Sequence, residues 1–281
     1  MQIIERILEM QRWSETERRQ GRQIALVPTM GFLHEGHLSL VRDGKMRGDR
    51  VVVSLFVNPA QFAPQEDFAS YPRDFARDRE LLNDIGIDVL FHPAVEEIYP
   101  EGFETRIEIG ELSKPLCGAV RPGHFSGVAT VVAKLFNIVR PQVAVFGCKD
   151  YQQLQIIRRL VRDLNFDIEV IGHPTVREPD GLAMSSRNAY LDSEERKAAL
   201  CLYRSLRYAE ELVRRGERRA AAIVDSARGE IAREALTRIE YISLCDPENL
   251  REIELITDSA LLALAVRIGK ARLIDNIILK P

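Results

Sequence analysis

Two histidines three residues apart, His34 and His37, are the side chains of this sequence best placed to do chemistry. Before them, residues 24–27 form an apolar, partly β-branched run that predicts a buried strand. After them, an amphipathic pattern predicts a helix, and a helix N-terminus with its unpaired N–H groups favours phosphate. Residues three apart share a face of a helical turn. The stretch therefore predicts two imidazole donors to a transferring phosphoryl group.

Two simpler interpretations of the histidine pair remain open from these residues alone. Histidines three apart on a helix are often surface residues or metal ligands. The metalloprotease motif H-E-x-x-H needs a spacing of four, and the H-E-G-H of this chain is one residue short. The strand and turn before His34 favour a nucleotide over a metal.

Polar side chains also follow two further predicted strands. Gln61 comes after the apolar run 51–57, and Lys149 comes after the run 143–146 and Gly147. In open α/β sheets, ligands bind beyond the carboxyl ends of the strands. Taken singly, Gln61 is more often an ordinary loop residue, and Lys149 is as often a solvated cation as a phosphate ligand.

The composition is that of a globular protein without an evident nucleic-acid or membrane partner. The 281 residues are 46% hydrophobic and 29% charged, as in ordinary globular proteins, and the formal net charge of −3 gives no case for nucleic acid or anionic membrane as a partner. We find no secretory signal pattern and no apolar run of membrane-spanning length. The four cysteines form no C-x-x-C pair, which fits a reducing cytoplasm.

Strand and helix patterns alternate through residue 171. We predict strands at 24–27, 51–57, 87–91, 143–146 and 168–171, and helices at 3–17, 38–46, 67–83 and 123–139. Parallel strands need crossover helices, so this alternation predicts an α/β fold with a doubly wound parallel sheet. No G-x-G-x-x-G follows the first strand, which disfavours a dinucleotide-binding protein. Beyond residue 176 we predict helices at 193–215 and 219–235 and strands at 240–244, 261–266 and 272–279, a smaller α+β domain.

Six stretches together resemble one known family. They are P-T-M-G-F-L-H-E-G-H at 28–37, S-L-F-V-N-P-A-Q-F at 54–62, Y-P-R-D at 71–74, R-P-G-H-F at 121–125, F-G-C-K-D-Y-Q-Q-L at 146–154 and D-G-L-A-M-S-S-R-N at 180–188. The first resembles the H-x-G-H signature of the adenylyl-transfer superfamily, and the last resembles its mobile K-M-S-K-S signature. The full set, in this order, is similar to the pantoate–β-alanine ligase (pantothenate synthetase) family.

The resemblance implies a fold and a reaction. It implies a Rossmann-like sheet domain of the H-x-G-H nucleotidyltransferase type at 1–175, binding ATP and pantoate, and a C-terminal α+β lid domain at 176–281. The implied reaction condenses (R)-pantoate with β-alanine, consumes ATP and releases AMP and pyrophosphate through a pantoyl-adenylate, in the synthesis of vitamin B5 and coenzyme A. It further implies a cytoplasmic homodimer that uses Mg²⁺.

The resemblance also implies site residues. His34, His37 and Lys149 are the expected catalytic residues, with His37 at the position of the proton donor. The expected ATP contacts are Met30, Gly31, His34, His37, Gly147, Cys148, Lys149, Asp150, Val176, Met184, Ser185, Ser186 and Arg187. Gln61 and Gln153 are expected to hold pantoate, with Gln61 also facing β-alanine, and Asp78 lies where the family offers a carboxylate toward Mg²⁺.

Two positions depart from the expected pattern. Cys148 stands where the family often carries glutamate, and Gly44 interrupts a predicted helix in which alanine is better by about 1 kcal/mol. Three rival functions also remain: a nucleotidyltransferase that keeps the nucleotide in its product, a non-catalytic nucleotide sensor, and a metal-dependent hydrolase using His34 and His37. Release of free AMP would exclude the nucleotidyltransferase, and turnover with pantoate and β-alanine would exclude the sensor. Metal analysis of the purified protein would decide whether it is the hydrolase.

Overall fold

The computed structural model describes all 281 residues and divides them into two compact units. The first unit comprises residues 1–109, 121–148 and 153–174, and the second comprises residues 110–120, 149–152 and 175–281. The two short segments 110–120 and 149–152 therefore belong with the C-terminal part of the chain.

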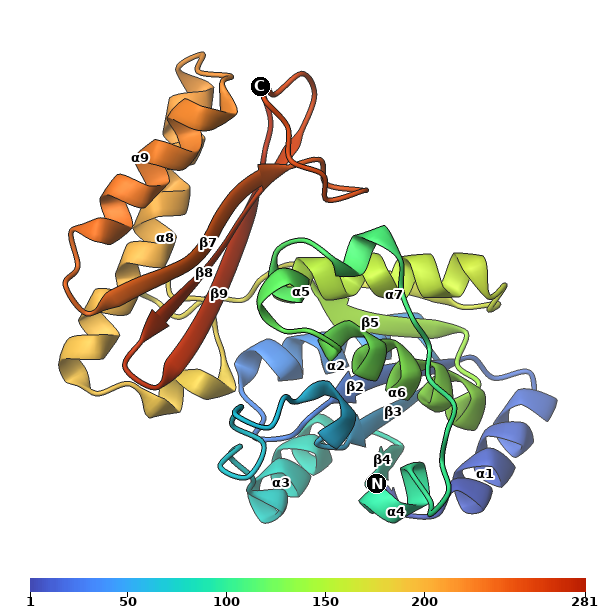
Figure 1. Ribbon diagram of the computed structural model, residues 1–281. Helices are drawn as coiled ribbons and strands as arrows, with labels where there is room; N and C mark the ends of the chain where they lie inside the picture. The colour runs from blue at the N-terminus through green and yellow to red at the C-terminus, as the bar shows by residue number, and fades with distance from the viewer. The chain divides into compact units, whose positions relative to one another are not determined.

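A six-stranded parallel sheet is the centre of the first unit (Figure 1). Its strands are β1 (Gln2–Ile4), β2 (Ile24–Thr29), β3 (Arg50–Leu55), β4 (Val89–Phe91), β5 (Val143–Gly147) and β6 (Glu169–His173), in the order β1-β4-β3-β2-β5-β6. The connecting helices are α1 (Ile7–Arg19), α2 (Glu35–Arg47), α3 (Phe75–Ile85), α4 (Val95–Ile98), α6 (His124–Val139) and α7 (Tyr151–Asp163). The prediction of a doubly wound parallel sheet is confirmed.

Alternating residues of the strands enter two separate cores, one on each face of the sheet. Ile24 and Leu26 of β2 pack in one core with residues of α1, α6 and α7. Ala25 and Val27 pack in the other core with residues of α2 and α3. Because both faces are covered by helices, the central strands contain continuous apolar runs, at 24–28, 51–53 and 143–146, rather than alternating apolar and polar residues.

The second unit is a two-layer α+β domain. Its antiparallel sheet has the order β7 (Thr237–Cys245), β8 (Ala260–Ile268) and β9 (Ala271–Leu279). Helices α8 (Ser193–Arg214) and α9 (Ala220–Ala232) share one hydrophobic core with this sheet. The short helix α5 (Cys117–Val120) also belongs to this unit.

Two predicted helices begin later than expected. The helix predicted at 3–17 spans Ile7–Arg19, because residues 2–4 form β1 and pair with β4. The helix predicted at 67–83 spans Phe75–Ile85, and the Asp74 carboxylate caps it by accepting a hydrogen bond from the N–H of Arg77 at 3.1 Å. None of the helices in the structure is both long and apolar enough to cross a bilayer.

Candidate functional site

The strand order of the first unit contains one reversal, at β2. From β2 the chain adds β3 and then β4 on one side, and it later adds β5 and β6 on the other side. In doubly wound sheets the crevice at such a reversal, beyond the carboxyl ends of the strands, is the usual ligand site. Here the segments leaving those ends are the H-x-G-H loop after β2 and residues 147–150 after β5.

The loop after β2 makes a sharp turn at Gly31, whose φ is +83°. A Cβ atom at Gly31 would lie 3.1 Å from Asp78 Oδ2 and 3.1 Å from a methyl group of Leu55. Glycine is therefore needed here both for its backbone conformation and for the close approach of its neighbours.

Asp78 holds this loop from helix α3. Its two carboxylate oxygens accept hydrogen bonds from the backbone N–H groups of Phe32 and Leu33, each at 2.7 Å. The side chain is 1% exposed, and burial raises the pKa of Asp78 even though both backbone hydrogen bonds act to lower it. Asp78 thus uses both oxygens to shape the turn that leads into His34.

His34 and His37 lie at the beginning of α2, with ring centroids 4.0 Å apart. The backbone N–H of His34 donates to Nδ1 of His37 at 3.3 Å. Since Nδ1 accepts in this bond, the proton of neutral His37 is assigned to Nε2. His37 therefore carries an N–H donor at the outer edge of its ring, at a helix N-terminus that already favours anions.

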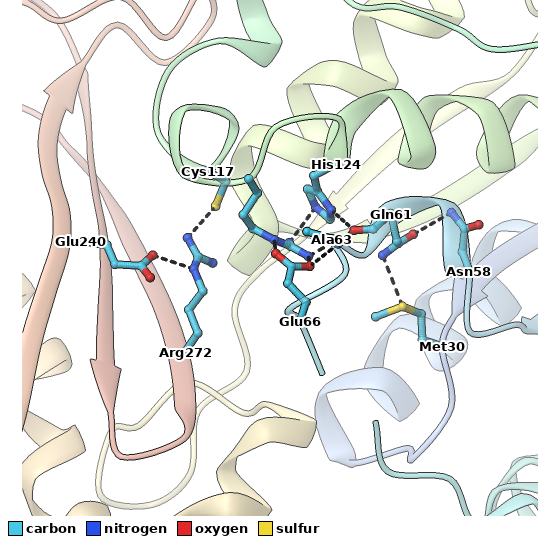
Figure 2. Close-up of polar contacts among 10 residues, drawn as sticks. Met30, Asn58, Gln61, Ala63, Glu66, Cys117, His124, Glu240 and Arg272 are labelled. Carbon is cyan, nitrogen blue, oxygen red and sulfur yellow. Dashed lines mark hydrogen bonds and ion pairs between the residues drawn. The ribbon is translucent and has the colours of Figure 1, made fainter. Parts of the chain in front are cut away.

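The Gln61 side chain is held between two partners (Figure 2). It belongs to the short 3₁₀ turn η1 (Pro59–Gln61), which follows β3. Its Oε1 accepts from Asn58 Nδ2 at 3.1 Å, and its Nε2 lies 3.3 Å from the sulfur of Met30. The contact with Met30 brings a predicted pantoate residue to a predicted ATP residue.

Asn58 is a residue that the sequence reasoning missed. Its side chain accepts from the N–H of Ala60 and the hydroxyl of Tyr99, and it donates to the backbone carbonyl of Gly127 as well as to Gln61. Asparagine before proline is a turn signal that the sequence did display. The partners that make Asn58 important are distant in sequence and were not predictable from that signal.

Residues 147–153 continue from β5. Gly147 ends the strand opposite His173 of β6, and nothing lies within 4 Å of the position that a Cβ would take. Burial raises the pKa of the Cys148 thiol, with the nearby Arg158 opposing the effect. Cys148 is therefore a neutral thiol where the resembling family often has a carboxylate.

The neighbouring glutamines of α7 have different surroundings. Gln152 is buried; its Oε1 accepts from the N–H of Cys117 at 3.0 Å and its Nε2 donates to the carbonyls of Leu112 and Pro115. Gln153 is half-buried and lacks a comparable set of side-chain hydrogen bonds. Gln152 therefore stabilises the fold, and the contact of Gln153 with pantoate stays a prediction.

In the second unit, two parts of the chain that we predict to contact ATP, Val176 and residues 184–187, lie side by side. The N–H of Met184 donates to the carbonyl of Val176 at 3.0 Å, and Ser185 Oγ accepts from the N–H of Arg187 at 3.3 Å. Arg177 anchors this segment to β9 through two hydrogen bonds to buried Asp275, at 2.6 and 3.0 Å.

The same unit contains Lys149 and Asp150, whose charged atoms are 3.8 Å apart. The Lys149 carbonyl accepts from Asn276 Nδ2 of β9 at 2.8 Å. The predicted site residues thus form two groups. Met30, Gly31, His34, His37, Gln61, Asp78, Gly147, Cys148 and Gln153 lie in the first unit, and Lys149, Asp150, Val176, Met184, Ser185, Ser186 and Arg187 lie in the second.

Known proteins resemble this chain over its whole length. The sequence model of the family described as Pantoate-beta-alanine ligase matches residues 2–278. The pantothenate synthetase of Thermotoga neapolitana is 56% identical over 279 residues, covering 99% of this chain and 100% of that protein. That of Geobacter sulfurreducens is 53% identical over 279 residues and covers 99% of each.

Solved structures show the same similarity. The crystal structure of pantothenate synthetase from Thermus thermophilus superposes with a TM-score of 0.95 at 47% identity, covering 100% of both chains. The pantoate-beta-alanine ligase of Francisella tularensis, described as complexed with beta-gamma ATP and beta-alanine, has a TM-score of 0.82 at 36% identity and covers 99% of this chain and 97% of that one.

Proposed function

The chain belongs to the pantoate–beta-alanine ligase family, and from this premise we propose that it forms pantothenate by way of a pantoyl-adenylate. In the first step a pantoate carboxylate oxygen attacks the α-phosphorus of ATP, and the bond to pyrophosphate breaks. In the second step the β-alanine amine attacks the acyl carbon, AMP leaves, and the amine loses a proton. Free AMP as a product separates this reaction from that of a nucleotidyltransferase.

The observation that carries the proposal is the histidine pair at the N-terminus of α2, at the reversal of the strand order. Negative charge builds up on the phosphates as the carboxylate attacks, and preorganised donors stabilise such charge. We assign this task to His34, His37 and Lys149, with His37 as the proton donor. The Nε2–H tautomer of His37, derived from its bond with His34, supports a donor role.

We assign pantoate to Gln61 and Gln153, with Gln61 also facing β-alanine. An amide offers both a donor and an acceptor without net charge, which suits a substrate with hydroxyls and a carboxylate. The contact between Gln61 and Met30 supports this assignment, because it joins the pantoate residue to the loop that we assign to ATP. The remaining assigned ATP contacts are Gly31, Gly147, Cys148, Asp150, Val176, Met184, Ser185, Ser186 and Arg187.

Mg²⁺ belongs to the proposal as a partner of the ATP phosphates. The structure has no group of three or more histidine, cysteine or acidic side chains arranged to hold a metal ion. Asp78 fits the role of ligand poorly, because two backbone N–H groups occupy its oxygens. Magnesium in nucleotide sites is commonly held by phosphates, waters and one or two carboxylates, so a protein cage is not required.

We further propose that residues 1–175 bind ATP and pantoate, that residues 176–281 act as a lid, and that the enzyme is a cytoplasmic homodimer. The serine–serine–arginine segment in the second unit supports the lid, since the resembling signature closes on the triphosphate. Cysteines without paired spacing support a reducing compartment. Analytical ultracentrifugation of the purified chain tests the dimer: a single species at the monomer mass would contradict it.

Isotope exchange tests the reaction order. With pantoate, ATP and Mg²⁺ present and β-alanine absent, we expect labelled pyrophosphate to enter ATP. Oxygen-18 in the pantoate carboxylate should appear in AMP after a full turnover, because the mixed anhydride leaves that oxygen on phosphorus. No exchange without β-alanine, together with label retained wholly in pantothenate, would exclude the acyl-adenylate.

Two substitutions test the residue assignment. His37→Ala and Lys149→Ala should each slow single-turnover adenylation by about 10²–10³, the usual cost of removing one transition-state donor. Neither side chain is part of a hydrophobic core, so thermal melting should fall by only a few degrees, and in His37→Ala this small loss reflects the missing hydrogen bond from the His34 N–H. Near-normal adenylation in both variants would contradict the assignment.

A further inference from the structure

The R-P-G-H-F stretch at 121–125 has no task in the proposed reaction, yet its side chains surround the backbone of Gln61. The Arg121 guanidinium donates from Nε to Glu66 Oε1 at 2.7 Å and from Nη2 to Glu66 Oε2 at 2.6 Å. The Arg121 and Glu66 side chains are only 13% and 18% exposed. A two-point arginine–carboxylate pair of this kind fixes direction as well as distance.

The same guanidinium also reaches the Gln61 turn. Nη2 of Arg121 donates to the Gln61 carbonyl at 3.3 Å, and Nη1 lies 3.0 Å from Nε2 of His124. Nδ1 of His124 lies 2.8 Å from the Gln61 carbonyl oxygen. Figure 2 draws this contact as a dashed line. A carbonyl can only accept and a guanidinium can only donate, so His124 is assigned as the neutral Nδ1–H tautomer.

The ionisation of Glu66 is consistent with its pairing with Arg121. Burial would raise the pKa of Glu66, but the hydrogen bonds and positive charge of Arg121 outweigh it, and the pKa is lowered. Glu66 is therefore a carboxylate that keeps Arg121 in place, and it also accepts from the N–H of Ala63 at 3.3 Å.

Helix α6 approaches the turn closely as well. A Cβ atom at Gly127 would lie 2.2 Å from the carbonyl oxygen of Ala60 and 2.7 Å from the backbone nitrogen of Gln61. The Gly127 carbonyl in turn accepts from Asn58 Nδ2 at 3.1 Å. The turn is thus supported by the backbone of α6 on one side and by Arg121 and His124 at its carbonyl.

From this geometry we infer that Glu66, Arg121 and His124 are positioning residues for pantoate, acting through Gln61. They fix the carbonyl of Gln61, and Asn58 and Met30 contact its amide, so the amide is presented to the substrate in one orientation. The inference rests on the proposed role of Gln61 as a pantoate ligand. A displacement of about 1 Å in such a group can lower catalytic efficiency by roughly 10²-fold.

The test measures AMP release against pantoate concentration and, separately, against ATP concentration. His124→Ala should raise the KM for pantoate by about tenfold or more, with the KM for ATP within roughly twofold of the unmodified chain. His124→Asn should restore most of the loss, because its amide nitrogen is the same number of bonds from Cα as Nδ1 and can donate to the Gln61 carbonyl. Arg121→Lys should also raise the KM for pantoate, since one ammonium cannot serve Glu66, His124 and Gln61 together.

The control is Glu17→Gln in the same unit. Glu17 also accepts from two arginines, Arg22 at 2.6 Å and Arg50 at 2.8 Å, but Arg50 is at the amino end of β3, away from the carboxyl ends that lead into the site. This variant should lower the melting temperature and leave the KM for pantoate unchanged.

Two results would overturn the inference: equal increases of the KM for pantoate and ATP in His124→Ala, or an asparagine variant no better than alanine. Gln61→Ala separates this failure from that of the proposed function. If Gln61→Ala raises the KM for pantoate while the His124 and Arg121 variants do not, only the positioning role is wrong. If Gln61→Ala has no effect on pantoate, the assignment of Gln61 itself is wrong.

Discussion

Replacing Asp78 by asparagine exchanges one carboxylate oxygen for an NH₂ group, at a side chain that accepts two backbone hydrogen bonds. Asparagine can keep one of these acceptors, but its NH₂ group then faces the other N–H group. A hydrogen bond to a charged group contributes about 1.5–3 kcal/mol. Removing a buried charge offsets part of this loss, as the raised pKa of Asp78 indicates. We therefore expect the free energy of unfolding to fall by about 1–2 kcal/mol.

The larger effect of Asp78→Asn should be on adenylation. Phe32 and Leu33 lie directly before His34, so a displaced turn moves the N-terminus of α2. We expect pantoate-dependent pyrophosphate exchange to fall by about 10–100-fold. The melting temperature should fall by only a few degrees, since about 2–4 °C per kcal/mol is usual for chains of 150–250 residues.

Asp88→Asn is the matched control. Asp88 also accepts a backbone hydrogen bond, from Val51 at 2.8 Å, but near the amino end of β3. Asparagine can keep this single acceptor, so this variant should lose less stability than Asp78→Asn and should retain exchange activity.

A magnesium titration separates the two roles available to Asp78. If Asp78 shapes the loop, raising the Mg²⁺ concentration should not restore exchange in Asp78→Asn. Restoration to near the unmodified rate would refute the loop argument and support a metal ligand. If Asp78→Asn shows normal exchange at the usual Mg²⁺ concentration, the reaction requires neither loop shaping nor metal binding by Asp78.

Three further predictions concern stability and the glutamines. Gly44→Ala should raise the free energy of unfolding by about 1 kcal/mol, since the new methyl would make ordinary contacts of 3.4 Å or more. Gly48→Ala should lower it, because its Cβ would lie 2.9 Å from a backbone nitrogen; urea denaturation compares the two. Gln153→Ala should remove one pantoate contact of roughly 1–3 kcal/mol, which raises the KM for pantoate by about 5–150-fold and leaves the melting temperature unchanged. Gln152→Ala should instead lower the melting temperature. Equal losses of melting temperature in the two variants would contradict this. At Glu17, burial acts to raise the pKa, but two arginines outweigh it and the pKa is lowered from 4.5. The stability it contributes is therefore complete above about pH 5 and lost as the pH falls through the lowered value, and Glu17→Gln should flatten this part of the melting curve against pH.

Much of the fold could be predicted from local patterns. Residues 24–28 and 51–53 are continuous apolar runs because both faces of the sheet are covered, and that composition is visible in the sequence. Helix α6 was predicted at 123–139 and spans His124–Val139, because its apolar residues recur with the period of a helix and Pro141 follows it. The H-x-G-H loop was likewise predicted from its place between a strand and a helix.

One of the two misplaced helix starts occurred where a partner is distant in sequence, whereas the late start of α3 reflects the local cap at Asp74. Strand β1 has only three residues, and its apolar character also fits the start of a helix. What makes it a strand is pairing with β4, from Gln2 opposite Val89 to Ile4 opposite Phe91. No local pattern carries that information, because β propensity depends on the neighbouring strand.

Some residues of the candidate site could also be selected from the sequence, whereas their supporting contacts could not. Residue types and spacing were enough to select His34, His37, Gln61 and Lys149, since chemistry of this kind depends on which functional groups follow a strand. Only the tertiary structure gave Asp78 its place under the loop and joined Arg121 to Glu66, 55 positions away in the sequence. Such hydrogen bonds form because packing of the sheet and its helices brings distant segments within about 3 Å, a condition that no local sequence pattern records.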